Sequence, residues 1–301
     1  MINNYIDKLL QHLQSNKNKK DIDLILDGGA FNGSYHVGVL KYLSKLSSNE
    51  IIMIHRISAC SVGTIAAYLF LTDNLDKHYD IVYNLCYKSV THKGDLSGVM
   101  KVKQYFDKIA PKNTLEMINK KLFISYYDFK RNKKVVVSNY KSIEELHEII
   151  VRSCFIPIIV NNEIFYENRY LDGILPYVFK EKDNRKRLYV NLFALDKVFN
   201  VMNIHKEKTA IHRVINGITD VHLFFVKKRS TSLCSYVEDW DFSYTINYIF
   251  KYSIELLIYF FFFIIYSIKR NIEKQTLKRM QKSVFYKILC YSLKKIIKGL
   301  C

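Results

Sequence analysis

Apolar runs and segments of helical spacing alternate along the first part of the chain. The runs 22–26 and 51–57 are rich in Ile and Leu, and each leads into a turn of small residues followed by apolar residues three or four positions apart. This pattern predicts two successive strand–turn–helix units, with helices at 34–46 and 64–71. Such units indicate an α/β fold with a mainly parallel central sheet.

The same mixture continues to about residue 230. Residues 1–20 predict an amphipathic helix followed by a break rich in Lys and Asn, and residues 74–130 predict mostly helix. The pattern then predicts strands at 134–138, 164–170, 188–195 and 221–226 and helices at 143–153 and 209–218.

The C-terminal part differs in composition. Residues 256–268 are uncharged and include four consecutive Phe. This run is shorter than the roughly 20 residues that cross a bilayer. A longer span over 247–268 would include Lys251 and Glu255, and it would carry a basic segment across the membrane. We therefore expect an interfacial helix, with a single-pass span near 247–268 and a buried core helix as the alternatives.

The net charge is +18 over 301 residues, and half of it belongs to the C-terminal segment. Residues 268–301 contain ten Lys or Arg and one Glu, and apolar residues recur every three or four positions over 277–300. A basic amphipathic helix of this kind binds anionic bilayers. Nucleic acid would also fit the charge, but no recognition motif accompanies it. We therefore expect residues 256–301 to bind an anionic membrane surface and expect no nucleic-acid partner.

A candidate nucleophile stands between the second predicted strand and its helix. Ser61 lies in Ala59-Cys60-Ser61-Val62-Gly63, where small residues two positions before and after it permit a sharp turn that exposes its hydroxyl. The usual first residue of such an elbow is Gly, and Ala59 is tolerated if the backbone needs no positive φ there. The alternative is an ordinary helix N-cap at Ser61.

A glycine-rich turn follows the first predicted strand. It spans 27–33, reads DGGAFNG and opens a helix. Backbone N–H groups at a helix start bind anions, so this turn is suited to a dinucleotide phosphate or to an oxyanion. Ala30 stands where the dinucleotide pattern needs its second Gly, which favours the oxyanion role. The candidate donors are the amides of Gly28, Gly29 and Ala30.

A carboxylate follows a later predicted strand. Asp172 precedes Gly173 just after the run 164–170. A nucleophilic Ser needs a base, and no His has a comparable position at a strand end, so Asp172 is the candidate base for Ser61. The alternative is a hairpin turn, the commonest use of Asp-Gly.

These pieces resemble, in order and spacing, the motifs of the patatin-like phospholipases. That family has a D-G-G-G-x-R-G turn, a G-x-S-x-G elbow, an S-x-x-x-P segment and a D-G-G or D-G-A turn. Residues 27–33, 59–63, 153–157 and 172–174 match them, within a resemblance that covers 23–195. The resemblance implies a three-layer α/β/α sandwich that works through a Ser–Asp dyad and needs no cofactor or metal.

The resemblance also implies a role for each matched residue. Ser61 would be the nucleophile and Asp172 the general base, with an oxyanion hole formed by Gly28, Gly29 and Ala30. The residues that shape the turns would be Gly33, Ala59, Gly63 and Gly173.

Four positions depart from the family's pattern. They are Ala30 for the third Gly, Asn32 for a basic residue, Ala59 for the first Gly of the elbow and Ile174 for the small residue after Asp-Gly. None removes a reacting group, so we expect a serine lipid acyl hydrolase that cleaves fatty-acyl esters of phospholipids or glycerides. A catalytically silent lipid-binding protein of the same fold and a nucleotide-binding protein that uses the glycine turn are the alternatives.

The expected organisation has three parts: an N-terminal helix at 1–20, a catalytic domain at 21–229 and a hydrophobic and basic region at 230–301. Residues 1–20 lack the order of a signal peptide, so we expect a membrane-associated protein whose catalytic domain is cytosolic. The six cysteines lie far apart, with no Cys-x-x-Cys pair, so the sequence predicts no disulfide framework or metal site. A chain ending at Arg229 is expected to hydrolyse soluble esters but to bind vesicles poorly.

Overall fold

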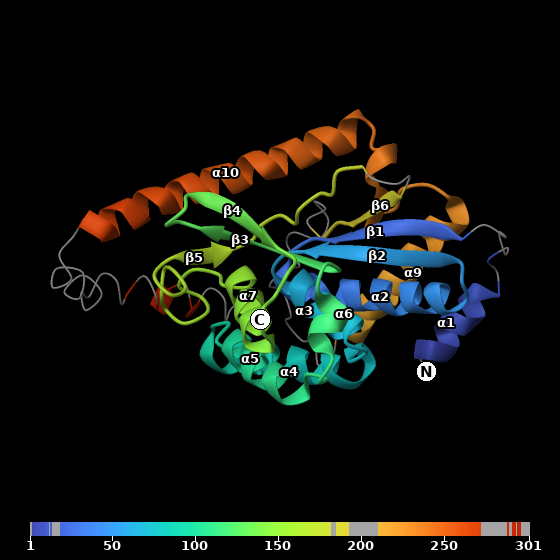
Figure 1. Ribbon diagram of the computed structural model, residues 1–301, viewed down its shortest axis with the longest axis horizontal. Coiled ribbons are helices and arrows are strands. Elements are labelled where there is room, and N and C mark those ends of the chain that lie inside the picture. The colour runs from blue at the N-terminus through green and yellow to red at the C-terminus, as the bar shows by residue number, and fades with distance from the viewer. Residues whose placement is uncertain are drawn as a thin grey trace.

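The computed structural model describes residues 2–11, 13, 19–181, 185–192, 210–271, 288, 291–292 and 294–295. Figure 1 shows the arrangement of its elements. In chain order these are α1 (Ile2–Leu10), β1 (Lys20–Leu26), the 3-10 turn η1 (Ala30–Asn32), α2 (Gly33–Ser48), β2 (Ile52–Ala59), α3 (Val62–Leu71), α4 (Leu75–Lys93), α5 (Gly98–Ile109), α6 (Thr114–Ile118), β3 (Leu122–Asp128), β4 (Lys133–Val137), α7 (Ile143–Ser153), β5 (Tyr170–Asp172), β6 (Lys186–Val190), α9 (Ile211–Lys227), β7 (Cys234–Tyr236), the 3-10 turn η2 (Val237–Asp239) and α10 (Phe242–Asn271).

A central sheet confirms the predicted α/β class. Its strand order is β4-β3-β2-β1-β6-β7, with β5 paired to β3. The four inner strands β3, β2, β1 and β6 are parallel, and the strands at its margins join antiparallel. The last five residues of β1 are all buried, as expected of a central parallel strand covered on both faces.

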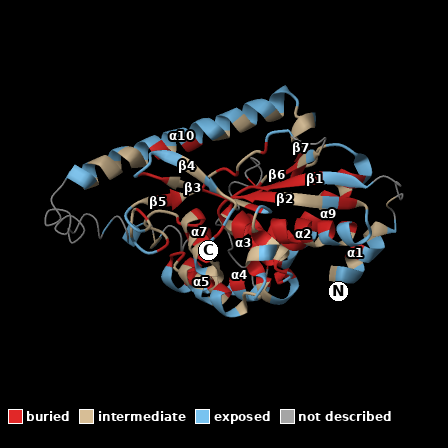
Figure 2. Cartoon of the chain, in the orientation of Figure 1, coloured by how far each residue is buried: buried red, intermediate tan, exposed pale blue. Residues whose placement is uncertain are grey.

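The sheet lies between two helical layers (Figure 1). On one face, α2 and α3 pack against the strands, with α9 against α2; α10 crosses the other face. The helices α2 and α9 approach so closely that a Cβ added at Gly38 would lie 2.0 Å from the Val214 carbonyl oxygen. Figure 2 shows that buried residues gather in the strands and in α2 and α3, whereas α10 is largely exposed.

Two secondary-structure predictions are wrong. Residues 221–226, expected as a strand, belong to α9, because Val214, Ile218, Val221 and Phe225 form one buried face at helical spacing. The helical expectation for 74–130 holds over α4, α5 and α6 but fails at β3, whose buried residues join the sheet.

Other predicted elements are shifted. Of the strand expected at 164–170, the structure has one bridge between Tyr166 and Tyr170, and β5 starts at Tyr170. Residues 193–195, predicted to end the strand that forms β6, lie outside the described residues. The N-terminal helix is present as α1, where Tyr5 bonds Thr219 of α9.

The C-terminal region begins inside the sheet. β7 lies beyond the expected boundary at residue 229 and pairs with β6, so the sheet extends into residues 230–301. Most of the predicted basic helix at 277–300 lies outside the described residues, although Ile288, residues 291–292 and residues 294–295 are helical.

Candidate active site

Ser61 occupies a sharp turn between β2 and α3. Its backbone has φ 48° and ψ −132°, a combination that residues other than Gly seldom adopt. Gly63 allows α3 to start against β1, since a Cβ there would lie 2.9 Å from the Asp27 carbonyl oxygen. Ala59 is part of β2 and has no positive φ, so its methyl group fits without backbone strain.

The Ser61 peptide is held from both sides. Its amide donates to Ser153 Oγ at 3.0 Å, and its carbonyl accepts from Thr64 Oγ1 at 2.6 Å and from Cys154 Sγ at 3.1 Å. The Ser61 side chain makes no capping bond to α3, although the residue stands at the N-cap position. The strained turn is therefore stabilised by its neighbours, and the hydroxyl is left for another partner.

That partner is Asp172. Ser61 Oγ donates to Asp172 Oδ2 at 3.0 Å, across 111 positions of sequence. Asp172 ends β5, and Gly173 packs so tightly on β3 that a Cβ would lie 2.0 Å from the Ser125 carbonyl oxygen. The Asp-Gly pair thus brings a carboxylate from the margin of the sheet to the end of β2.

The surroundings of Asp172 disfavour its charged form. Burial raises the pKa of this carboxyl well above its usual range, and the nearby charge of Glu255 raises it further, while the Ser61 hydroxyl acts in the opposite sense. A carboxylate with a raised pKa is a stronger proton acceptor than an ordinary one. The geometry and the electrostatics together suit proton transfer from Ser61.

The glycine-rich turn lies directly against Ser61. A Cβ added at Gly28 would meet Ser61 Cβ at 3.2 Å. The Gly28 amide donates to Asp27 Oδ1 at 3.1 Å, whereas the amides of Gly29 and Ala30 have no hydrogen-bond partner in the described part of the chain. Both residues have positive φ, 151° and 43°. Two of the three expected donors are thus available beside the candidate nucleophile, and the Asp27 carboxylate in the turn disfavours a dinucleotide phosphate.

Two basic side chains that the sequence did not single out for this turn approach it from distant helices. Arg213 of α9 is 2% exposed and donates to Asn32 Oδ1 at 2.8 Å, beside the position where the family pattern has a basic residue. Lys251 of α10 lies 3.4 Å from Asp27 Oδ2. Burial raises the pKa of Asp27, and Lys251 lowers it. Neither contact has a local sequence signal, because more than 180 positions separate each pair.

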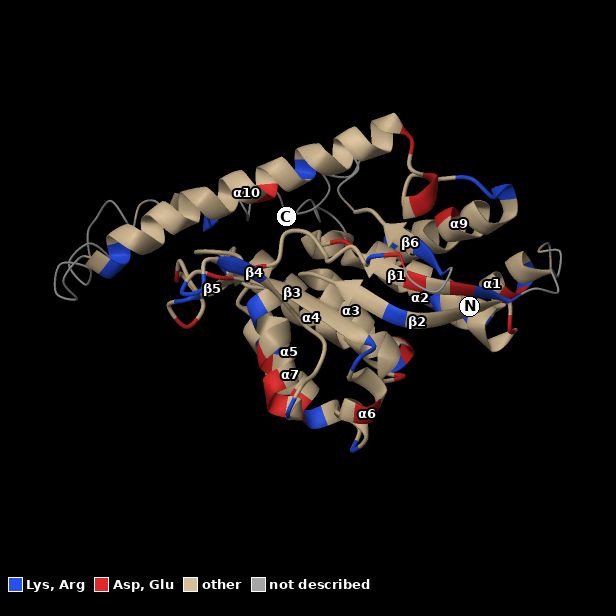
Figure 3. Ribbon diagram, turned by 45° about the horizontal axis from the view of Figure 1, so that its top comes forward, with Lys and Arg blue, Asp and Glu red and all other residues tan. Residues whose placement is uncertain are grey.

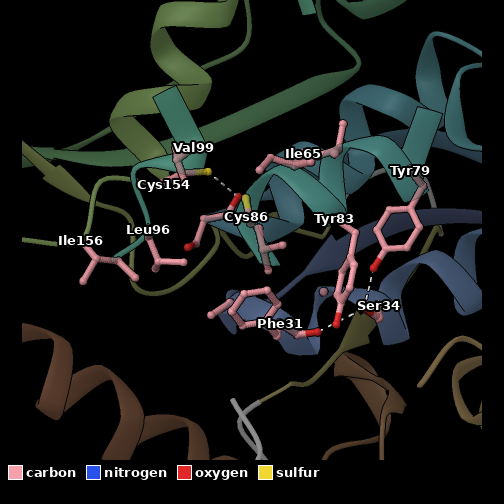
Figure 4. A pocket seen from close by; sticks show the side chains of 15 residues that line it. Phe31, Ser34, Ile65, Tyr79, Tyr83, Cys86, Leu96, Val99, Cys154 and Ile156 are labelled. Atoms are coloured by element: carbon pink, nitrogen blue, oxygen red, sulfur yellow. Dashed lines mark hydrogen bonds between the residues drawn. The ribbon is translucent and has the colours of Figure 1, made fainter. Parts of the chain in front are cut away.

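An apolar cavity opens next to Ser61 (Figure 4). Its volume is about 600 Å³ when the solvent at its open side is included, and its walls come mainly from α4 and from the turns that carry Ser61 and Ala30 with the helices that follow them. The side chains at its apolar wall include Phe31, Ile65, Val82, Tyr83, Leu96, Val99 and Ile156. Ser34 and Tyr79 share a hydrogen bond at its edge. Such a chamber suits an extended hydrocarbon chain whose reacting end reaches Ser61.

Two further structural properties bear on function. Within the described ranges, no three His, Cys, Asp or Glu side chains form a group suited to a metal ion.

The helix α10 is long and apolar enough to cross a membrane by length and composition, and 11% of its most apolar 18-residue stretch is buried.

Comparison with known proteins gives the same family as the motifs. A model of the patatin-like phospholipase family matches residues 24–175. The chain is 28% identical over 154 residues to a mouse omega-hydroxyceramide transacylase, covering 48% of this chain and 26% of that protein. It is 27% identical to the human protein of the same name, covering 48% of this chain and 29% of that protein. It is also 27% identical to a mouse 1-acylglycerol-3-phosphate O-acyltransferase, covering 48% of this chain and 37% of that protein.

The chain thus matches well under half the length of these curated relatives. The family comprises lipid acyl hydrolases and acyltransferases. By its motifs, its sheet and this match over half its length, the chain belongs to the patatin-like phospholipase family.

Proposed function

We propose that this protein is a serine lipid acyl hydrolase that cleaves fatty-acyl esters of membrane phospholipids or glycerides. The observation that carries the proposal is the hydrogen bond from Ser61 Oγ to the half-buried Asp172 carboxylate, beside an apolar cavity. The 28% identity to a transacylase is too low to transfer a substrate, so the substrate class rests on the cavity and the family.

In the proposed first half-reaction, Asp172 accepts the hydroxyl proton as Ser61 Oγ attacks the ester carbonyl carbon. The tetrahedral oxyanion receives hydrogen bonds from the amides of Gly29 and Ala30, and one such donor typically contributes about 3 kcal/mol to transition-state stabilisation. The C–O bond to the alcohol then breaks, the proton passes from Asp172 to the departing alkoxide, and the acyl group stays on Ser61 as an ester.

In the second half-reaction, a water molecule gives its proton to Asp172 and attacks the acyl-enzyme. The fatty acid leaves and the proton returns to Ser61. An alcohol in place of water would give acyl transfer by the same steps. We keep acyl transfer as the second candidate function because the similar proteins are named a transacylase and an acyltransferase.

We further propose that α10 holds the protein on a membrane surface. Its outward face is apolar, and the exposed fractions of Phe250, Leu257 and Phe260 all exceed 60%. The inner face of the same helix is attached to the domain through Lys251, which binds Asp27 and Asn191. A helix bound in this way suits a position along the bilayer surface, with the positive charge of residues 268–301 next to anionic lipid head groups.

The test is product analysis with mixed phospholipids and neutral glycerides, in the presence and absence of an added alcohol. We expect fatty acid, or acylated alcohol, from the wild type and neither product from Ser61→Ala or Asp172→Asn, while vesicle binding is retained. Labelling by a fluorophosphonate probe should require Ser61. Equal turnover by Ser61→Ala would refute the assignment, and a wild type that binds vesicles without turnover or labelling would indicate the silent lipid-binding alternative.

A further inference from the structure

Three side chains on the inner face of α10 point at the active-site loops. Lys251, Glu255 and Tyr259 are spaced four residues apart, so they lie in one row along the helix. Glu255 is 1% exposed and Tyr259 is 3% exposed, and they are the two buried residues of α10, which is otherwise largely exposed. Figure 3 shows how few charged residues α10 carries. A buried Glu at the centre of such a helix is unusual, because Glu is seldom fully buried.

Tyr259 bonds the backbone on both sides of Gly173. Its hydroxyl lies 3.1 Å from the Asp172 carbonyl oxygen and accepts from the Ile174 amide at 3.3 Å. Its ring stacks on Tyr127 of β3, with 4.0 Å between the ring centroids. The ring packing and the hydroxyl contacts are separable, because Phe keeps the first and removes the second.

Glu255 binds the next residue of the same loop. Its Oε1 accepts from the Leu175 amide at 3.0 Å, and its carboxylate is paired with Lys134 of β4 at 2.9 Å. From the opposite side, Ser125 Oγ of β3 donates to the Leu175 carbonyl at 3.0 Å. The loop 172–175 is therefore held between the sheet and α10.

We propose that Glu255 and Tyr259 are positioning residues for Asp172, so that α10 is part of the catalytic machinery as well as a membrane-facing helix. This inference rests on the proposed role of Asp172 as the base. The two side chains fix the backbone from which the Asp172 carboxylate extends, and that carboxylate must stay within hydrogen-bond distance of Ser61 Oγ.

The charge of Glu255 gives the proposal a signature that a purely structural contact lacks. The carboxyl of Asp172 is affected by the Ser61 hydroxyl, the Gly173 amide and the negative charge of Glu255, which is itself paired with Lys134. The charge of Asp172 in turn raises the pKa of its neighbours Cys60, Cys154 and Tyr259. Replacing Glu255 by Gln removes a negative charge and leaves the positive charge of Lys134. The loss of the negative charge and the unbalanced positive charge of Lys134 both lower the pKa of Asp172.

The experiment uses the full chain and a soluble fatty-acyl ester, so that membrane binding does not enter the measurement. The variants are Tyr259→Phe, Glu255→Gln and the control Tyr252→Phe, which removes the hydroxyl of an exposed Tyr on the same helix. We expect Tyr259→Phe, which removes the hydroxyl contacts to the Asp172 carbonyl and the Ile174 amide, to lower kcat about tenfold with little change in KM. We expect Glu255→Gln to move the acidic limb of the pH–rate profile to lower pH, and Tyr252→Phe to match the wild type.

The outcomes separate this inference from the proposed function. The inference would be overturned, and the hydrolase assignment would stand, if turnover depends on Ser61 but two results fail to appear. These are a lower kcat in Tyr259→Phe and a shift of the acidic limb of the pH–rate profile in Glu255→Gln. A wild type without Ser61-dependent turnover would overturn both. If Glu255→Gln does not fold because Lys134 loses its partner, the kcat of Tyr259→Phe decides alone.

Discussion

Ser153 and Ser61 are joined by a hydrogen bond of 3.0 Å from the Ser61 amide to Ser153 Oγ, and Ser153 in turn donates to the Ser125 carbonyl at 2.7 Å. The helix α7 and the strand β3 thereby hold the strained turn of the proposed nucleophile. All three atoms are buried, so no water replaces these bonds if the hydroxyl is lost.

We expect Ser153→Ala to lower both stability and activity. The variant leaves the buried Ser61 amide and Ser125 carbonyl without their partner, which typically costs about 1–3 kcal/mol. The measurement is chemical unfolding together with the rate of fluorophosphonate labelling at Ser61. Ser48→Ala, at an exposed Ser, is the control; a labelling rate in Ser153→Ala equal to that of this control would contradict the positioning role.

Because its pKa is raised, the ionised form of Asp172 that the reaction needs destabilises the folded protein. For this carboxyl the pKa in the folded protein lies above the ordinary Asp value of 3.8, so stability falls as the pH rises from about that value through the folded pKa. Asp172→Asn removes this cost. We expect the variant to be inactive yet more stable than the wild type at neutral pH, and the difference in melting temperature to vanish near pH 3.

The same pKa sets the expected pH dependence of the reaction. Asp172 accepts a proton only when ionised, so kcat/KM for a soluble ester should rise with pH through its raised pKa. The acidic limb should therefore lie above the range of an ordinary Asp. A limb near pH 4 would mean that Asp172 titrates normally in the free enzyme.

Gly173→Ala should abolish activity. The added Cβ would lie 2.0 Å from a backbone oxygen of β3, so the loop must move and carry Asp172 away from Ser61. Ile174→Ala, which introduces the small residue typical of the family, is the matched change next to it and should retain activity. The check is turnover of a soluble ester combined with circular dichroism, and an active Gly173→Ala would show that the loop yields without cost.

The outer face of α10 should determine vesicle binding. Leu257 and Phe261 are 67% and 59% exposed, and changing both to Ser removes apolar area that would otherwise enter the bilayer. Because burying such a side chain is worth about 1.5–3 kcal/mol, each change should weaken partitioning to anionic vesicles by roughly tenfold or more. Ile211→Ser, at an exposed Ile of α9, is the control in the same sedimentation assay. Equal partitioning of the double variant and this control would rule out α10 as the membrane contact.

The structure also changes the expectation for a shortened chain. Ending the chain at Arg229 was expected to preserve the hydrolysis of soluble esters. It would instead delete β7 from the sheet and remove Lys251, Glu255 and Tyr259 from the active-site loops. We now expect such a chain to lose activity on soluble esters as well as vesicle binding.

The sequence alone predicted the features that depend on local patterns. Two strand–turn–helix units, the elbow at Ser61 and the turn at 27–33 were readable because hydrophobic spacing and small residues determine the backbone over short distances. The helix 143–153 was predicted with the bounds of α7 for the same reason, since Ser142 caps it and its apolar face is regular.

Only the tertiary structure decided which distant side chains meet these local features. Asn32 lacks the charge of the family's basic residue, and Arg213 approaches the turn because α2 and α9 pack closely. The apolar run in α10 predicted an interfacial helix and gave no sign of a contact with the site, yet Glu255 and Tyr259 bind the loop that carries Asp172. The composition of a helix shows which face is apolar, but which loop lies under its polar residues depends on contacts between segments far apart in the chain, and no local pattern encodes them.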